Sequence, residues 1–192
     1  MEIPPFELER WLDEYEPDAD LMLAESGVRS LPADRFDLDV GELGYVIPTD
    51  GDPAFRGEVA DRYGRDGEEV VLTCGTQEAD FLTCLSLLDE GDHAVVVEPT
   101  YQSLRSVPES LASVTTVGTE PPTWELDVDA VADAVRPETA LIVLTNPGNP
   151  TGKYLGPETI RALYDLAADG DAYLLVDEVY RMLADDPHEP AA

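Results

Sequence analysis

Lysine is nearly missing from this chain: ten of its 11 basic residues are arginine, and Lys153 is the only lysine. Aspartate and glutamate number 42, so the formal net charge at pH 7 is -31. Such a chain repels itself at low salt and stays soluble at high salt, a property that halophiles use. Because the acidic residues spread along the whole chain, we favour a halophilic source over a merely acidic cytosolic protein. The scarcity of positive charge also argues against nucleic-acid binding.

Cysteine, histidine and long apolar runs are scarce too. Cys74 and Cys84 fit neither a disulfide framework nor a metal signature, and we expect His93 and His188 to be structural or solvated. We therefore predict no metal site. No apolar run approaches the ~20 residues that cross a bilayer. The N-terminus lacks the basic and apolar regions of a signal peptide, so we expect a cytoplasmic protein without membrane association.

The apolar pattern predicts an α/β domain after residue 70, large enough for one sizeable core. Short apolar runs predict five strands, at residues 70–73, 93–97, 114–117, 140–144 and 173–176. Segments with helical periodicity lie between them, at residues 77–88, 101–111, 128–135 and 157–168. This alternation is typical of a largely parallel sheet with helical crossovers. Before it, we predict helices at residues 6–16 and 53–63, joined by an arm or loop region at residues 17–52.

The residues that follow each predicted strand are informative, because open α/β sheets bind ligands outside the carboxyl ends of their strands. After residues 70–73, Gly75 lets a ligand approach the backbone, while Thr76 and Gln77 begin a helix whose N-terminus favours a phosphate. An ordinary turn with a threonine cap is the alternative. After residues 93–97, Tyr101 can form one wall of a flat-ligand pocket or simply pack in the core.

Two longer motifs follow the last two predicted strands. Residues 146–152 read Asn-Pro-Gly-Asn-Pro-Thr-Gly, a tight loop that can project an asparagine toward a ligand. Asp177 begins the motif Asp-Glu-Val-Tyr, and a carboxylate at the end of a buried strand is costly without a partner. The pyridinium nitrogen of pyridoxal phosphate is such a partner. A hydrolase aspartate and a Mg²⁺ ligand are the competing interpretations.

Together these stretches resemble the large domain of fold-type I pyridoxal-phosphate-dependent aminotransferases of classes I and II. The motifs at residues 146–152 and 177–180, in this order and at this spacing, make the resemblance specific. It implies an α/β three-layer sandwich with a mostly parallel sheet, and a homodimer. It also implies that residues 1–44 form an N-terminal arm with part of the small domain. Residues 45–192 would then form part of the cofactor-binding large domain.

The resemblance gives each matching residue a role in binding pyridoxal 5′-phosphate. Gly75, Thr76 and Gln77 match the loop that holds the cofactor phosphate. Four side chains match groups that hold the ring: Tyr101 by stacking, Asn149 and Tyr180 at the ring hydroxyl, and Asp177 at the ring nitrogen. Tyr45 matches a tyrosine that reaches the phosphate bound by the neighbouring subunit. The stretch after Tyr45 matches the family more loosely.

The resemblance also shows what these 192 residues do not contain. The family's Schiff-base lysine shuttles the proton during transamination and lies a few dozen residues beyond the Asp-x-x-Tyr motif, in a Ser-x-x-Lys context. This sequence ends before that point, and Lys153 lies in a turn where the family does not place the lysine. Two further strands of the family sheet would separate the strand at residues 70–73 from the rest. We therefore expect an incomplete catalytic site and a chain that folds poorly alone.

Three hypotheses about function follow. The first is a truncated aminotransferase whose full-length form exchanges amino groups between amino acids and 2-oxo acids. The second is a non-catalytic fragment that binds the cofactor or a partner through the retained pocket. The third is a related pyridoxal-phosphate lyase or cyclase, because the stretches at residues 6–11 and 25–28 faintly resemble capreomycidine-synthase-like members.

Overall fold

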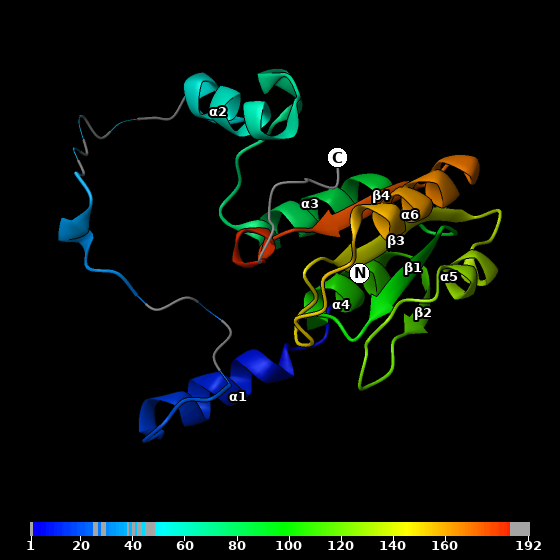
Figure 1. The fold of residues 1–192 in the computed structure, drawn as a ribbon, viewed down its shortest axis with the longest axis horizontal. Helices are drawn as coiled ribbons and strands as arrows, with labels where there is room; N and C mark the ends of the chain where they lie inside the picture. Colours follow the sequence, from blue (N-terminus) through cyan, green and yellow to red (C-terminus); the bar gives the residue numbers. More distant parts are fainter. Residues whose placement is uncertain are drawn as a thin grey trace. The chain divides into compact units, whose positions relative to one another are not determined.

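A sheet of four parallel strands forms the centre of the computed structural model, which describes residues 2–24, 27, 30–37, 39, 41, 44 and 49–184. The strands, which lie in the order β2-β1-β3-β4 (Figure 1), are β1 (His93–Glu98), β2 (Ser113–Gly118), β3 (Thr139–Thr145) and β4 (Tyr173–Asp177). Every neighbouring pair is parallel. The predicted α/β class is therefore confirmed, and these four strands match predicted ones to within one residue at each end.

Helices were predicted equally closely, to within one residue at each end. They are α1 (Glu7–Tyr15), α2 (Pro53–Tyr63), α3 (Thr76–Leu87), α4 (Gln102–Leu111), α5 (Val128–Ala134) and α6 (Pro157–Asp169). Short 3₁₀ helices occur at η1 (Glu16–Asp18), η2 (Ala33–Arg35), η3 (Gly67–Glu69) and η4 (Arg181–Leu183). No helix within the described ranges is both long and apolar enough to span a membrane.

Alternating side chains of the sheet build two apolar clusters, one on each face. One cluster joins residues such as Val95 and Ile142 to α5 and α6. The other joins residues such as Val96 and Val143 to α3 and α4. Since successive residues of a strand point to opposite faces, both faces of β1 and β3 are buried by helices. The result is the expected three-layer sandwich, with the sheet between two helical layers (Figure 1).

The strand predicted at residues 70–73 is absent, and this prediction is wrong. The structure gives these residues no strand, and the Val71 side chain is 64% exposed. Leu72 instead donates its N–H to the carbonyl of Asp50 at 3.0 Å. An isolated apolar run becomes a strand only where a neighbouring strand pairs with it, and none of the four described strands does so here.

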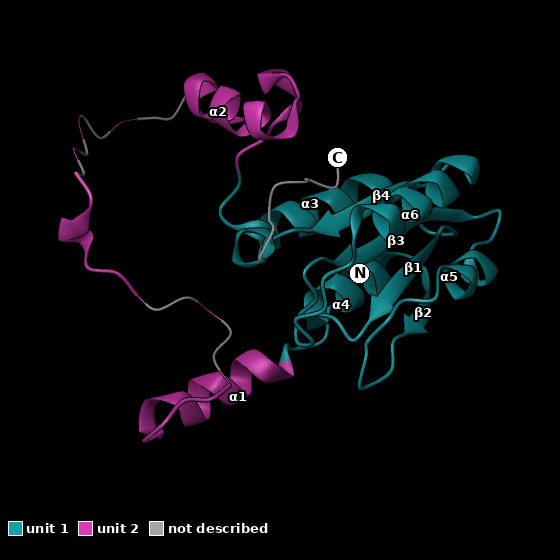
Figure 2. Cartoon of the chain, in the orientation of Figure 1, with its two compact units in different colours: residues 1–6, 73–192 teal, residues 7–72 magenta. Residues whose placement is uncertain are grey.

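Contacts divide the chain into two units, residues 1–6 with 73–192 and residues 7–72 (Figure 2). In the second unit, the Asp52 carboxylate caps α2 by accepting hydrogen bonds from the N–H groups of Ala54 and Phe55. Arg56 is 8% exposed, donates from Nε to the carbonyl of Gly67 at 2.9 Å, and forms an ion pair with Asp50. These contacts attach α2 to the segments on either side of it.

Candidate functional site

Strands β3 and β4 end side by side, so the stretches that follow them share one edge of the sheet. Thr145 pairs with Asp177 in the register of the sheet, and the N–H of Asn146 donates to the carbonyl of Asp177 at 2.9 Å. The stretch after β1 reaches the same edge, where the hydroxyl of Thr100 lies 3.1 Å from that of Thr145. Three of the predicted strand-end stretches therefore meet at the edge where α/β sheets bind ligands.

Asp177 is the last residue of β4 and is buried, with 8% of its surface exposed. Its Oδ1 accepts a hydrogen bond from the N–H of Val179 at 2.9 Å, and within the described ranges no hydrogen bond reaches Oδ2. Burial raises the pKa of Asp177; the Val179 hydrogen bond opposes this rise, and the charge of Glu178 adds to it. A cationic N–H facing Oδ2 would lower that pKa, so the position fits a protonated ring nitrogen.

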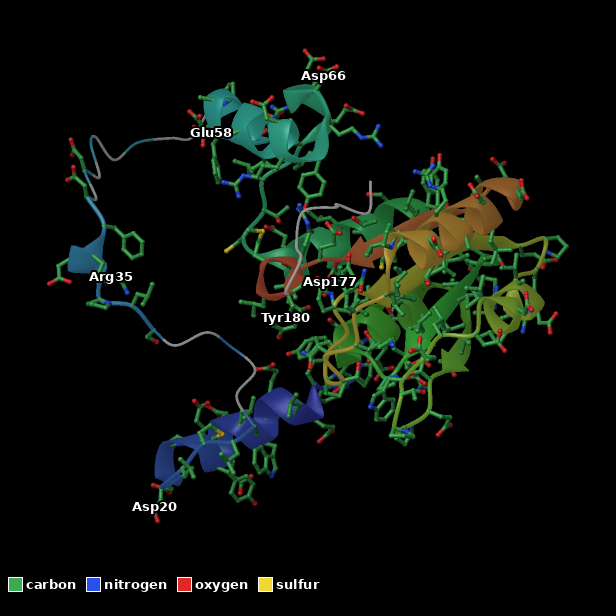
Figure 3. All side chains as sticks on the ribbon, viewed as in Figure 1. Asp20, Arg35, Glu58, Asp66, Asp177 and Tyr180 are labelled. Carbon is green, nitrogen blue, oxygen red and sulfur yellow. The ribbon has the colours of Figure 1, made fainter. Side chains whose placement is uncertain are left out.

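The side chains of Asn149 and Tyr180 contact one another near the end of β4, the strand that ends at Asp177. Asn149 Nδ2 donates to the Tyr180 hydroxyl at 3.3 Å, although 31 positions separate the two residues. Both side chains are half-buried. Tyr180 lies in the short turn after β4, and Figure 3 shows it at the same end of the strand as Asp177. An amide N–H and a phenol O–H at this edge can both donate to an oxygen atom of a ligand.

The two asparagines of the loop at residues 146–152 differ in what they bind. Asn146 is 5% exposed; its Nδ2 donates to the carbonyl of Leu155 at 3.0 Å, and its Oδ1 accepts from the Leu155 N–H at 2.8 Å. Asn146 therefore ties the loop to the core. Asn149 makes no such backbone contact in the described structure and points toward Tyr180. The peptide bond between Asn149 and Pro150 is cis.

The loop before α3 has the features of an anion-binding helix N-terminus. Gly75 is the N-cap, with φ of 82°, a left-handed conformation that glycine adopts readily. Thr76 and Gln77 begin α3, and N–H groups of a first helical turn have no intrahelical acceptor. The carboxylate of Glu78 accepts a hydrogen bond from the N–H of Cys74 at 2.5 Å, which fixes the backbone just before α3. The first-turn N–H groups of Thr76 and Gln77 are suited to a phosphate.

Two tyrosines, the only lysine and the expected absence of a metal site remain from the sequence predictions. Tyr101 is half-buried at the N-cap of α4, directly after the β1 end of the sheet. Tyr45 lies outside the described residues. Lys153 forms an ion pair with Glu125, and its side chain is 26% exposed. Among the described residues, no group of three or more histidine, cysteine, aspartate or glutamate side chains is arranged to hold a metal ion.

Asp80 is a residue that the sequence analysis missed. It is half-buried on α3, and burial, followed by the charge of Asp177, raises the pKa of Asp80 to about 7. Asp80 therefore belongs to the same acidic end of the site as Asp177. The available sequence signal was an acidic residue four positions before Cys84, on a helix face that is otherwise apolar.

Comparisons with known proteins give a consistent result. The sequence matches the family described as aminotransferase class I and II over residues 16–192. A probable aspartate aminotransferase of Methanocaldococcus jannaschii is 31% identical over 159 residues, which is 79% of this chain and 42% of that protein. A probable aspartate/prephenate aminotransferase of Thermus aquaticus is 33% identical over 181 residues, or 88% of this chain and 44% of that protein.

Solved structures give the same picture. A PLP-dependent aminotransferase from Streptococcus suis superposes with a TM-score of 0.86 at 31% identity, covering 93% of this chain and 52% of that one. The N-succinyldiaminopimelate aminotransferase of Mycobacterium tuberculosis superposes with a TM-score of 0.69 at 30% identity, covering 75% of this chain and 41% of that one. The chain spans about half, or less, of the length of the proteins it resembles.

Proposed function

This chain belongs to the aminotransferase class I and II family, and from that premise we propose that it forms most of the cofactor cradle of an enzyme that transfers amino groups between amino acids and 2-oxo acids. The cofactor of this family is pyridoxal 5′-phosphate. The observation that carries the proposal is the buried carboxylate of Asp177, whose Oδ2 accepts no hydrogen bond within the described ranges. Burial favours the neutral form of such a carboxyl group, and a cationic partner is what favours its charged form.

Each residue of the cradle has one task in this proposal. Gly75, Thr76 and Gln77 bind the phosphate group through the free N–H groups at the N-terminus of α3. Asp177 accepts a hydrogen bond from the protonated ring nitrogen and stabilises its positive charge. Asn149 and Tyr180, which already contact one another, donate hydrogen bonds to the ring hydroxyl.

Tyr101 supplies an aromatic face for stacking in this proposal. Pyridoxal 5′-phosphate, when bound, supplies a ring that withdraws the electron pair released at the α-carbon of the amino acid. A positively charged ring nitrogen is essential to that withdrawal, and Asp177 keeps it charged. The residues of this chain therefore bind and polarise the ring; proton transfer at the α-carbon requires a further base.

We assign that base to polypeptide beyond these 192 residues. Lys153 is the only lysine here, and its ammonium group pairs with Glu125 in the loop region before α5. The outer side of β4 pairs with none of the described strands, so further strands can join the sheet at this edge. The short span of the chain relative to its relatives supports the same assignment.

The proposal also includes the domain boundaries, the oligomeric state, the cellular compartment and the salt adaptation of the protein. Residues 1–44 would form an N-terminal arm with part of the small domain, and residues 45–192 part of the large domain. The complete enzyme would be a cytoplasmic homodimer in which Tyr45 reaches the phosphate bound by the neighbouring subunit. The net charge of -31 supports a halophilic protein, since acidic side chains repel one another less when salt screens them.

The test uses the complete gene product, purified in high salt and mixed with pyridoxal 5′-phosphate. We expect the absorbance spectrum of the cofactor to change when the protein binds it, and to change again when an amino acid is added. Asp177→Asn should weaken binding strongly, and Glu90→Gln, which removes an exposed charge after α3, should leave it unchanged. A protein that binds no cofactor, or in which Asp177→Asn binds it normally, would contradict the proposal.

Reduction with borohydride and peptide mapping identify the lysine that reacts. A label on a lysine beyond residue 192, in a Ser-x-x-Lys context, supports the assignment of the base. A stoichiometric label on Lys153, accompanied by amino-acid turnover, would contradict it. Binding without any turnover would favour a non-catalytic fragment, and turnover to an eliminated or cyclised product would favour a lyase or cyclase.

A further inference from the structure

An acidic side chain lies on the face of α3 that packs against the sheet. Cys84, one turn after Asp80, is 1% exposed and belongs to the apolar cluster that includes Val96 and Leu175. Residues four apart share a helix face, so Asp80 faces the same side as Cys84. The charge of Asp80 also acts on Cys84, whose pKa is raised to about 11, mainly by burial. A core-facing helix position normally carries an apolar residue, and packing alone does not explain an acid there.

Leu175 and Asp177 are two residues apart on β4, so their side chains point to the same face of the sheet, the face on which Leu175 shares an apolar cluster with Cys84 of α3. Asp80 and Asp177 therefore lie on facing elements, and the charge of Asp177 adds to the rise in the pKa of Asp80. Asp177, at the end of β4, is 8% exposed. Glu178, beside Asp177, adds a further negative charge, and no basic side chain contributes to the pKa of either aspartate. Within the described ranges, no hydrogen bond or ion pair reaches the side chain of Asp80. Two carboxyl groups in one partly buried place, without a cation, share a proton because both cannot ionise easily.

We propose that Asp80 is a positioning residue for Asp177, and that the two carboxyl groups together select a ligand that carries a protonated ring nitrogen. The inference rests on the function proposed above, in which Asp177 holds that nitrogen. Without a cation, the pair keeps one proton, held mainly by Asp80. When a cationic N–H faces Asp177, its positive charge favours ionisation of both groups, and Asp80 releases its proton.

The proton of the pair is accounted for with either form of the ligand. A ligand that arrives with a charged ring nitrogen causes the proton of Asp80 to leave to solvent. A ligand that arrives with a neutral ring nitrogen takes up the proton of the pair, and no other acid is required. In both cases two carboxylates face one cation, which attracts the cation more strongly than Asp177 alone would.

The test compares pyridoxal 5′-phosphate with the analogue whose ring has a C–H group in place of the nitrogen. The complete gene product is titrated with each ligand near pH 7, and the ratio of the two dissociation constants measures the preference for the ring nitrogen. Asp80→Asn keeps the shape of the side chain and removes its charge. We expect it to reduce the preference about tenfold, the equivalent of one pKa unit at the ring nitrogen. Glu90→Gln, an exposed neutralisation close to α3, should leave the ratio unchanged.

The outcomes separate the two proposals. If the wild-type protein binds neither ligand, the proposed function fails. If it prefers pyridoxal 5′-phosphate and Asp80→Asn retains the full preference, the function stands and the role of Asp80 is refuted. A purely structural Asp80 would change stability in the variant without changing the ratio.

A second measurement needs no variant. The carboxyl carbon of Asp80, followed by NMR in the wild-type protein, should titrate near pH 7 without ligand. Its midpoint should fall when pyridoxal 5′-phosphate is added, and it should stay in place with the C–H analogue. Equal midpoints with both ligands would overturn the proposal even if Asp80→Asn failed to fold.

Discussion

Replacing Asn146 with alanine should destabilise the protein strongly, although Asn146 touches no ligand in the proposed site. Its side chain satisfies both backbone polar groups of Leu155, with distances of 3.0 Å to the carbonyl and 2.8 Å from the N–H. Asn146 is 5% exposed and Leu155 is 8% exposed, so water reaches these groups poorly. Alanine leaves an N–H donor and a carbonyl acceptor without partners at the base of the loop.

The size of the effect follows from those two groups. An unsatisfied buried polar group costs about 1–3 kcal/mol, so leaving two such groups without partners should lower the free energy of unfolding by about 2–6 kcal/mol. That is a large part of the ~5–15 kcal/mol that holds a typical domain together. Asn149→Ala is the matched control, since it makes the same chemical change three positions later. It removes one 3.3 Å hydrogen bond from a half-buried side chain, so we expect a loss below about 1 kcal/mol.

Denaturant unfolding in high salt measures both variants, and cofactor titration of the folded fraction measures their binding. Asn146→Ala should shift the unfolding midpoint far more than Asn149→Ala does. Asn149→Ala should weaken cofactor binding while the protein remains folded. Equal destabilisation by the two variants would refute the separation of a structural asparagine from a ligand-binding one.

Three further predictions concern stability and pH. Burial, assisted by Arg136, lowers the pKa of His93, whose ring nitrogens bond Thr139 at 2.7 Å and Thr115 at 2.9 Å. His93 is therefore protonated more readily in the unfolded state than in the folded state, so its contribution to stability should fall as pH drops below about 6.5. When the free energy of unfolding is measured at a series of pH values, His93→Gln should lack this loss of stability at low pH. Gly75→Ala should cost about 1–2 kcal/mol, because alanine is strained at φ of 82°, and a denaturant series that shows no loss would contradict this. The melting temperature should rise with KCl concentration, because salt screens the net charge of -31, and a flat or falling curve would refute the halophilic interpretation.

The periodicity of apolar residues was enough to predict most of the secondary structure. Helical and strand patterns are local, so α2 and β1 were predicted within one residue of their ends. The failure at residues 70–73 has a non-local cause. A strand exists only through pairing, and an apolar run carries no information about whether a neighbouring strand is present.

The order of the strand-end motifs indicated the position of the site, because parallel strands bring their carboxyl ends to one edge. Asn149 and Tyr180 were therefore expected at that edge, and the structure places them in contact. Nothing in the motif itself distinguished Asn146 from Asn149, since both precede a proline in the same loop. Their different roles emerge only from which one faces the backbone of Leu155.

Residue types and their local spacing thus specified the α/β class, the boundaries of four strands and six helices, and the chemical character of the proposed cofactor cradle. Tertiary packing specified the partners: it buried Asp177, brought Asp80 within range of its charge, and turned Asn146 toward the core. The physical reason is that periodicity acts over a few residues of chain. Desolvation and charge–charge interactions depend instead on neighbours in space, which in this protein are separated by up to about a hundred positions, as Asp80 and Asp177 are.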